Sequence, residues 1–133
     1  MDDNGLVSVR SAFPVRETID RLASTVTAKG LMVFARIDHA ANAAAVGLSL
    51  RPTELLIFGN PKVGTALMLE KQTAAIDLPV KAIAWEDADG ATWLTYVDAA
   101  WLAQRHGLGE DSAPTVEAIR VGLAAVTAAA TSA

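Results

Sequence analysis

A short segment after an apolar run near the middle of the chain carries the residues best suited to hold a ligand. Asn60 is a good helix N-cap, and Pro61 is pre-set for the first helical position. Lys62 would then lie among unpaired backbone N–H groups, with Gly64 and Thr65 beside it. Because free N–H groups and a lysine both attract negative charge, this segment predicts a site for a carboxylate or phosphate.

A second pair of polar residues, Asp38 and His39, follows another predicted strand. The ends of neighbouring strands can lie on the same rim of a sheet, so the two segments would form one pocket. There His39 could act as an acid or base near neutral pH, with Asp38 orienting it and Lys62 holding an anion. The competing interpretation needs no ligand, because Asp38 and Asn60 would cap helices while His39 and Lys62 face solvent.

Other chemical signatures are weak or missing. The only histidines, His39 and His106, are far apart, and the chain has no cysteine, so no metal site is expected. His106 is expected to interact with the C-terminal end of a short helix. Gly59 and Gly64 do not lead into the Gly-Lys-Ser/Thr ending of a nucleoside-triphosphate loop and are interpreted as a turn glycine and a close-packing glycine. No cofactor is predicted, and the serine motif of hydrolases does not occur.

Composition narrows the class of protein. The net charge is −4, the pI is about 5.0 and no basic run occurs, so nucleic acid is not an expected partner. Residues 1–5 lack the basic and apolar regions of a signal peptide, and no apolar run approaches the ~18 residues of a membrane span. We therefore expect a cytoplasmic protein with no membrane partner, folded as a single domain over residues 1–133.

Hydrophobic periodicity defines the elements that must position these residues. Strands are predicted over residues 6–12, 31–37, 53–58, 80–85 and 92–97. Helices are predicted over residues 14–29, 40–46, 61–73, 99–106 and from about 112 to 126, fraying into a tail at 127–133. The Asp-Gly pair at 89–90 indicates an antiparallel hairpin. This order predicts an α+β two-layer sandwich, with a sheet of about five strands and helices packed mainly on one face.

Aromatic residues gather on and after that hairpin. Trp85, Trp93 and Tyr96 lie on its strands, and Trp101 lies on the helix beyond it. They would form part of the core, or else line a ligand cleft or a subunit interface. Trp85 and Trp93 are expected as cross-strand neighbours. The acidic residues at 86–89 are interpreted as a solvated hairpin tip rather than a cation site.

Several short motifs together resemble a known family. They are Phe34-Ala35-Arg36-Ile37-Asp38-His39, Phe58-Gly59-Asn60-Pro61-Lys62-Val63-Gly64-Thr65 with Leu67-Met68, Asp77-Leu78-Pro79, and Trp85-Glu86-Asp87 with Gly90 and Tyr96. From Gly5 to about Leu108 the chain resembles the bacterial and archaeal family catalogued as domain of unknown function 302. The resemblance implies a TATA-binding-protein-like α+β fold, often seen as a dimer. It implies no reaction and gives no reason to expect DNA binding.

Three functional hypotheses remain open at this stage. The leading one is a non-enzymatic module, expected as a homodimer, that binds a small anionic or amphipathic ligand or a partner protein around Asp38, His39, Asn60 and Lys62. The second is a small enzyme that uses His39 as a general acid or base. The third is a purely structural or assembly protein. Convergence of these side chains in one concave pocket would favour the enzyme.

Overall fold

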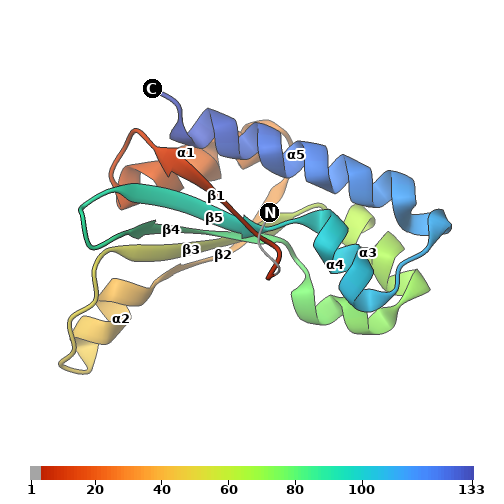
Figure 1. Cartoon of the computed structure of the whole chain (residues 1–133), viewed down its shortest axis with the longest axis horizontal. Helices are drawn as coiled ribbons and strands as arrows, with labels where there is room; N and C mark the ends of the chain where they lie inside the picture. Colours follow the sequence, from red (N-terminus) through yellow and green to blue (C-terminus); the bar gives the residue numbers. More distant parts are fainter. Residues whose placement is uncertain (1–3) are drawn as a thin grey trace.

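The computed structural model describes residues 4–133 (Figure 1). Its strands are β1 (Leu6–Ser11), β2 (Met32–Asp38), β3 (Thr53–Gly59), β4 (Lys81–Glu86) and β5 (Thr92–Val97). Its helices are α1 (Val15–Ala28), α2 (His39–Ala45), α3 (Pro61–Glu70), α4 (Ala99–His106) and α5 (Ala113–Thr131). Two short 3-10 helices, η1 (Gln72–Asp77) and η2 (Glu110–Ser112), complete the described elements.

All five strands belong to one sheet in the order β1-β5-β4-β3-β2, and every neighbouring pair is antiparallel. Figure 1 shows α1 and α5 side by side above this sheet, with α3 and α4 gathered beyond one end of it. Near the opposite end α2 projects to the side away from α1 and α5. The predicted α+β sandwich, with helices on one main face, is confirmed.

The core lies between the sheet and the two long helices. Ile19, Leu22 and Val26 follow one another at three- and four-residue spacing on α1 and are fully buried. Leu56 and Phe58 alternate with less buried residues on β3 and face that helix from the sheet. Burial of these large apolar side chains, each worth about 1.5–3 kcal/mol, is the main force that joins the layers.

Local signals set the end of α1 and the turn of the hairpin. Gly30 has a φ of +79°, and the N–H of Leu31 donates to the Val26 carbonyl at 2.9 Å, which closes the helix as the sequence predicts. In the hairpin, Trp85 lies opposite Trp93 and the two rings stack with centroids 6.5 Å apart. Both expectations are confirmed.

The C-terminal segment departs from the prediction. The sequence predicts fraying from residue 127, but residues 127–131 continue α5, and Thr127, Ala130 and Thr131 are buried. The carbonyl of Thr131 accepts a 2.8 Å hydrogen bond from the N–H of Ala12, and the Arg21 guanidinium reaches carbonyls of the last turn. Small side chains let this end of α5 approach α1 closely, a tertiary contact that local propensity does not report.

Candidate functional site

The cap of α3 forms as the sequence predicts, but it uses the donors that an anion would need. Asn60 Oδ1 accepts a 2.9 Å hydrogen bond from the N–H of Lys62. The Asn60 carbonyl accepts from the N–H groups of Val63 and Gly64 at 3.0 and 3.1 Å, and Pro61 has no N–H. The first turn of α3 therefore presents no unpaired backbone donor, and the expected geometry for a carboxylate or phosphate is absent there.

The second predicted pair lies at the other end of the sheet. Because β2 and β3 are antiparallel, Asp38 pairs with Glu54 at the start of β3, while Gly59 at its end pairs with the first residue of β2. The five-residue run of β3 between these two points spans about 17 Å. The C-terminal ends of two neighbouring strands meet on one rim only when the strands are parallel, so Asp38 and His39 do not share a pocket with Asn60 and Lys62.

Asp38 acts as a cap in this position. Its Oδ1 accepts a 2.9 Å hydrogen bond from the N–H of Ala41, in the first turn of α2. His39 is the first residue of that helix and is half-buried. An acid–base pocket built from His39 and Lys62 is therefore not assembled, which removes the convergence that the enzyme hypothesis required.

An apolar cavity of about 380 Å³ opens beside the predicted ligand segment, between α3, α5 and the adjoining end of the sheet. Its lining residues are Leu31, Phe34, Phe58, Gly59, Asn60, Pro61, Val63, Gly64, Thr65, Met68, Leu78, Pro79, Val80, Ala118, Ile119, Gly122, Leu123 and Val126. Three of the predicted site residues, Asn60, Gly64 and Thr65, are among them, whereas Lys62, Asp38 and His39 are not. No lining side chain is titratable, so the cavity offers shape and apolar surface rather than an acid or base.

Two helical glycines line this cavity, Gly64 on α3 and Gly122 on α5. A Cβ added to Gly64 on α3 would meet only the Met68 Cε, at 3.9 Å, and one added to Gly122 on α5 would meet nothing within 4 Å. Neither glycine has a positive φ, so the backbone does not require glycine at either position. The expectation that Gly64 allows close packing is wrong, because space rather than a neighbour lies above it.

Most of the cavity wall comes from residues that sequence reasoning did not assign to a site. Ala118, Ile119 and Gly122 belong to the predicted last helix, and the structure places them in the wall opposite α3. The available signal was the glycine itself, since Gly122 interrupts an otherwise alanine-rich helix at a cost of about 0.5–1 kcal/mol relative to alanine. Its place beside the same cavity as Gly64 could not be read from the chain.

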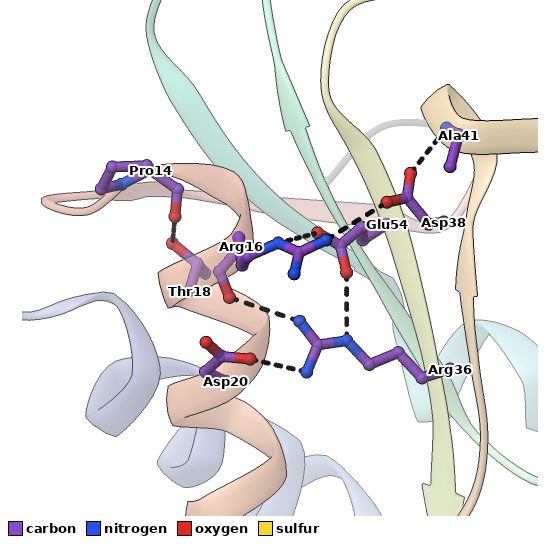
Figure 2. A network of polar contacts seen from close by, with 8 residues as sticks. All are labelled: Pro14, Arg16, Thr18, Asp20, Arg36, Asp38, Ala41 and Glu54. Carbon is purple, nitrogen blue, oxygen red and sulfur yellow. Dashed lines mark hydrogen bonds and ion pairs between the residues drawn. The ribbon is translucent and has the colours of Figure 1, made fainter. Parts of the chain in front are cut away.

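A buried acid joins α1 to the edge of the sheet (Figure 2). The side chain of Glu54 is 6 % exposed, and its Oε1 accepts a 3.0 Å hydrogen bond from Arg36 Nε. Arg36 also contacts Asp20 on α1 at 2.6 Å, and Arg16 lies 3.9 Å from Glu54 Oε2 and 3.6 Å from Asp38 Oδ2. This network fixes the start of β3 and accounts for Asp38 without any ligand.

A second polar cluster holds the far end of α4. His106 Nε2 lies 2.5 Å from Asp77 Oδ2, and Arg105 Nη1 lies 3.1 Å from both carboxylate oxygens. The sequence predicts that His106 interacts with the terminal carbonyls of its helix, and its partner is instead the side chain that ends η1. Within residues 4–133 no group of three His, Asp or Glu side chains is arranged to hold a metal ion.

Three surface carboxylates, Glu70, Asp87 and Glu117, have lowered pKa values, the last because of its hydrogen bond from Arg120. Hydrogen bonds from the Ser112 hydroxyl and the Gly109 N–H lower the pKa of Glu70 from its ordinary value of 4.5. Hydrogen bonds from the Trp93 indole and the Ala91 N–H likewise lower the pKa of Asp87. Glu70 fastens η2 to α3, and Asp87 fastens the hairpin turn, so neither shift marks a reactive group.

Fold and site together define an α+β protein with one antiparallel sheet, helices mainly on one face (Figure 1), and an apolar cavity at one end. The chain belongs to the family described as Domain of unknown function DUF302, whose model matches residues 7–129. The crystal structure of an uncharacterized conserved DUF302 protein from Bacillus stearothermophilus superposes with a TM-score of 0.81 at 20 % identity, over 92 % of this chain and 95 % of that one. That likeness shows the fold and no activity.

Curated relatives from Brucella are closer in sequence. The chain is 52 % identical over 125 residues to "Fluoride-specific ion channel FluC 1" of Brucella suis, which covers 94 % of this chain and 49 % of that protein. The protein of the same name in Brucella abortus matches at 52 %, with 46 % of its length covered. The chain therefore spans about half the length of these relatives.

One helix in the described part of the chain has the length and composition of a membrane span. It runs over Glu110–Thr131, with a mean hydropathy of 1.2 in its most apolar window. Helices in the interior of globular proteins meet the same criterion. Leu123, Val126 and Ala130 of this helix are buried in the core, but only 28 % of its most apolar window is buried. Glu117 and Arg120 form an ion pair on its exposed surface.

Proposed function

We propose that this chain is a non-enzymatic binding module that holds a small, neutral amphipathic molecule in the cavity between α3 and α5. A volume of about 380 Å³ is within the usual range of small-molecule sites, which is about 300–1,000 Å³. The wall is formed by aliphatic and aromatic side chains from the sheet and both helices. Such a cavity selects for apolar bulk, with orientation supplied by the few polar groups at its edge.

The observation that carries this proposal is that two helical glycines, Gly64 and Gly122, line the cavity. Protein interiors are close-packed, and an alanine at either position would gain helix propensity and fill space. Gly64 and Gly122 instead keep an opening between two helices, at positions where the backbone does not need glycine. An unfilled volume maintained at a cost in stability is expected where a ligand occupies it.

The polar edge favours a neutral head group over an anion. Asn60 and Thr65 are exposed at the cavity, with an amide and a hydroxyl that can exchange hydrogen bonds with an alcohol or amide. The N–H groups of Lys62, Val63 and Gly64 already donate hydrogen bonds to Asn60, so they are not free to bind an anion at this helix terminus. We therefore favour the amphipathic member of the two predicted ligand classes.

The Brucella relatives are named as fluoride-specific ion channels, which is a membrane activity. We assign ion conduction to the half of those proteins that this chain does not match. The sheet is open, with β1 and β2 as unpaired edges. Only helices and closed barrels satisfy their backbone groups in a bilayer, so an open sheet is unsuited to form a pore. We propose that the module works in the cytoplasm, where a chain without cysteines needs no disulfides.

The test is displacement of a fluorescent apolar probe. N-phenylnaphthylamine would be titrated into the purified protein and then displaced with decanol or with decanoate. We expect saturable probe binding, displacement by both compounds, and a preference for decanol. Gly122→Leu and Gly64→Leu place a side chain in the open volume and should each weaken probe binding by at least about tenfold, which is about 1.4 kcal/mol.

A matched control comes from the same helix. Ala124 is exposed and does not line the cavity, so Ala124→Leu adds the same side chain outside the site and should leave binding unchanged. Lys62→Ala separates the head-group classes, because a loss of binding confined to decanoate would mean that the lysine holds an anion after all. Probe binding that neither glycine variant reduces would contradict the proposal.

A further inference from the structure

Two side chains can contact the polar group of a ligand at the edge of the cavity. Among the described residues that line it, only Asn60 and Thr65 have a side chain with an N–H or O–H group. Both residues are exposed, so they lie where the cavity meets solvent rather than in its apolar interior. Their hydrogen-bonding properties therefore decide which head group fits at this edge.

The contacts of Asn60 fix which end of its side-chain amide remains free. Its Oδ1 accepts a 2.9 Å hydrogen bond from the N–H of Lys62. A backbone N–H can only donate, so the amide oxygen must face it and the amide nitrogen cannot take that place. Within residues 4–133 the Asn60 Nδ2 group has no hydrogen-bond partner. What Asn60 Nδ2 offers to a ligand is therefore a pair of N–H donors.

Capping alone does not require an amide at this position. Aspartate caps a helix as well as asparagine does, and its negative charge is also favoured at a helix N-terminus. Asp38 and Asp98 cap α2 and α4 in this way. The group that asparagine has and aspartate lacks is the side-chain NH₂, which the cap of α3 does not use.

Thr65 is the other polar side chain at the edge, and it does not choose between head groups. Its hydroxyl has no hydrogen-bond partner in the described part of the chain, and a hydroxyl can either donate or accept. Thr65 can therefore add a hydrogen bond to a ligand of either kind. The choice between an acceptor and a donor depends on Asn60.

We propose that the ligand carries an uncharged carbonyl group, as in a ketone or an ester, and that Asn60 Nδ2 donates a hydrogen bond to its oxygen. This inference rests on the proposed function and names the head group of the same amphipathic ligand. A carbonyl oxygen only accepts, so one donor satisfies it and no O–H or N–H of the ligand is left unpaired beside an apolar wall. An ammonium group would bring donors to a donor. A carboxylate would bring a charge that none of the described lining residues compensates.

Exchange of Asn60 for aspartate tests the proposal, because it keeps the cap and removes the donor. Displacement of N-phenylnaphthylamine at pH 7 would give the affinities for 2-decanone and for decylamine, which is a cation at this pH. We expect Asn60→Asp to weaken binding of 2-decanone by at least about fivefold, which is about 1 kcal/mol, and to strengthen binding of decylamine by a similar factor. Binding of the apolar probe itself should change by less than about twofold, since the apolar wall is unchanged.

Asn4→Asp is the matched control. Asn4 Oδ1 accepts from the N–H two residues further on, that of Leu6 at 3.1 Å, as Asn60 does from Lys62, but Asn4 does not line the cavity. This exchange adds the same charge outside the site and should leave both affinities unchanged. Asn60→Ser also keeps a good N-cap but adds no charge, and it should weaken binding of 2-decanone alone. Circular dichroism verifies the fold of each variant.

The outcomes separate the head group from the function on which it rests. Opposite changes in the two affinities, confined to Asn60→Asp, would support the carbonyl assignment. Saturable probe binding by wild type, with either affinity unchanged in Asn60→Asp, would overturn that assignment and leave the cavity as a binding site. Equal changes in Asn4→Asp would overturn it as well, since charge alone would then explain them. The absence of saturable probe binding by wild type would overturn both proposals.

Discussion

Glu54 is the residue on which the polar contacts at the edge of the sheet depend. Its carboxylate is nearly inaccessible and has two arginines within 4 Å, so its charge is compensated although it lies on the core side of β3. Arg36 is more exposed, at 33 % of its side chain, and is shared with Asp20. Removal of Glu54 should therefore cost more stability than removal of Asp20, because it leaves Arg36 without its buried acceptor.

We predict that Glu54→Ala lowers the free energy of unfolding by about 1–3 kcal/mol, because it removes the charged acceptor from the network. Asp20→Ala, on the exposed side of the same arginine, should cost less than about 1 kcal/mol. Urea denaturation of both variants measures the difference. Equal losses would mean that burial of Glu54 adds nothing to the contact.

Glu70 gives a pH dependence with a defined sign. Its pKa is lowered in the folded protein by the Ser112 hydroxyl and the Gly109 N–H, so the carboxylate stabilises the fold when it is ionised. That contribution is complete above the ordinary value of 4.5 and is lost as the pH falls through the lower folded pKa.

Wild type should therefore be more stable than Glu70→Gln at pH 7, and the difference should decrease below pH 4.5 and disappear once the pH is below the folded pKa of Glu70. Urea midpoints measured at pH 7 and at acid pH give the comparison. A difference that persists unchanged in acid would show that the charge of Glu70 is irrelevant to the contact with η2.

At the scale of elements, α5 contributes side chains to the core and also lines the cavity. One side of the helix packs on α1 and the sheet through Leu123, Val126 and Ala130. The neighbouring side carries Gly122 at the mouth of the cavity, where an added Cβ would have no atom within 4 Å. A larger side chain at Gly122 would therefore improve the packing of α5 and reduce the volume of the cavity.

Gly122→Ala should stabilise the protein by about 0.5–1 kcal/mol, since alanine restricts the unfolded chain and fits the open space. Thermal unfolding without ligand measures the gain. Gly107→Ala is the contrasting substitution, because Gly107 has a φ of +65° and should lose stability. A destabilised Gly122→Ala protein would mean that the cavity closes in solution.

At the scale of the whole molecule, α1 and α5 cover one face of the sheet (Figure 1), and the apolar cavity lies between α3, α5 and the adjoining end of the sheet. The chain matches about half of the length of the Brucella relatives, whose name is that of an ion channel.

We predict that this chain, mixed with vesicles loaded with fluoride, produces no efflux above that of empty vesicles, as measured with a fluoride electrode. The full-length Brucella suis relative is the positive control named for that activity. Fluoride release by the chain alone would contradict our assignment of conduction to the unmatched half and would direct attention to α5.

The sequence by itself determined most of the helices and strands, the caps at Asp38 and Asn60, and the fold class. The end of α1 at Gly30, the cap at Asn60 and the stacked hairpin tryptophans all depend on residues close together in the chain or paired across a tight turn. Tertiary structure decided the site. Antiparallel pairing of β2 with β3 separated Asp38 from Asn60, and the packing of α3 near α5 brought Gly64 and Gly122 to the wall of one cavity. Neither outcome leaves a local signal, because strand direction and helix placement depend on how distant apolar surfaces are buried together.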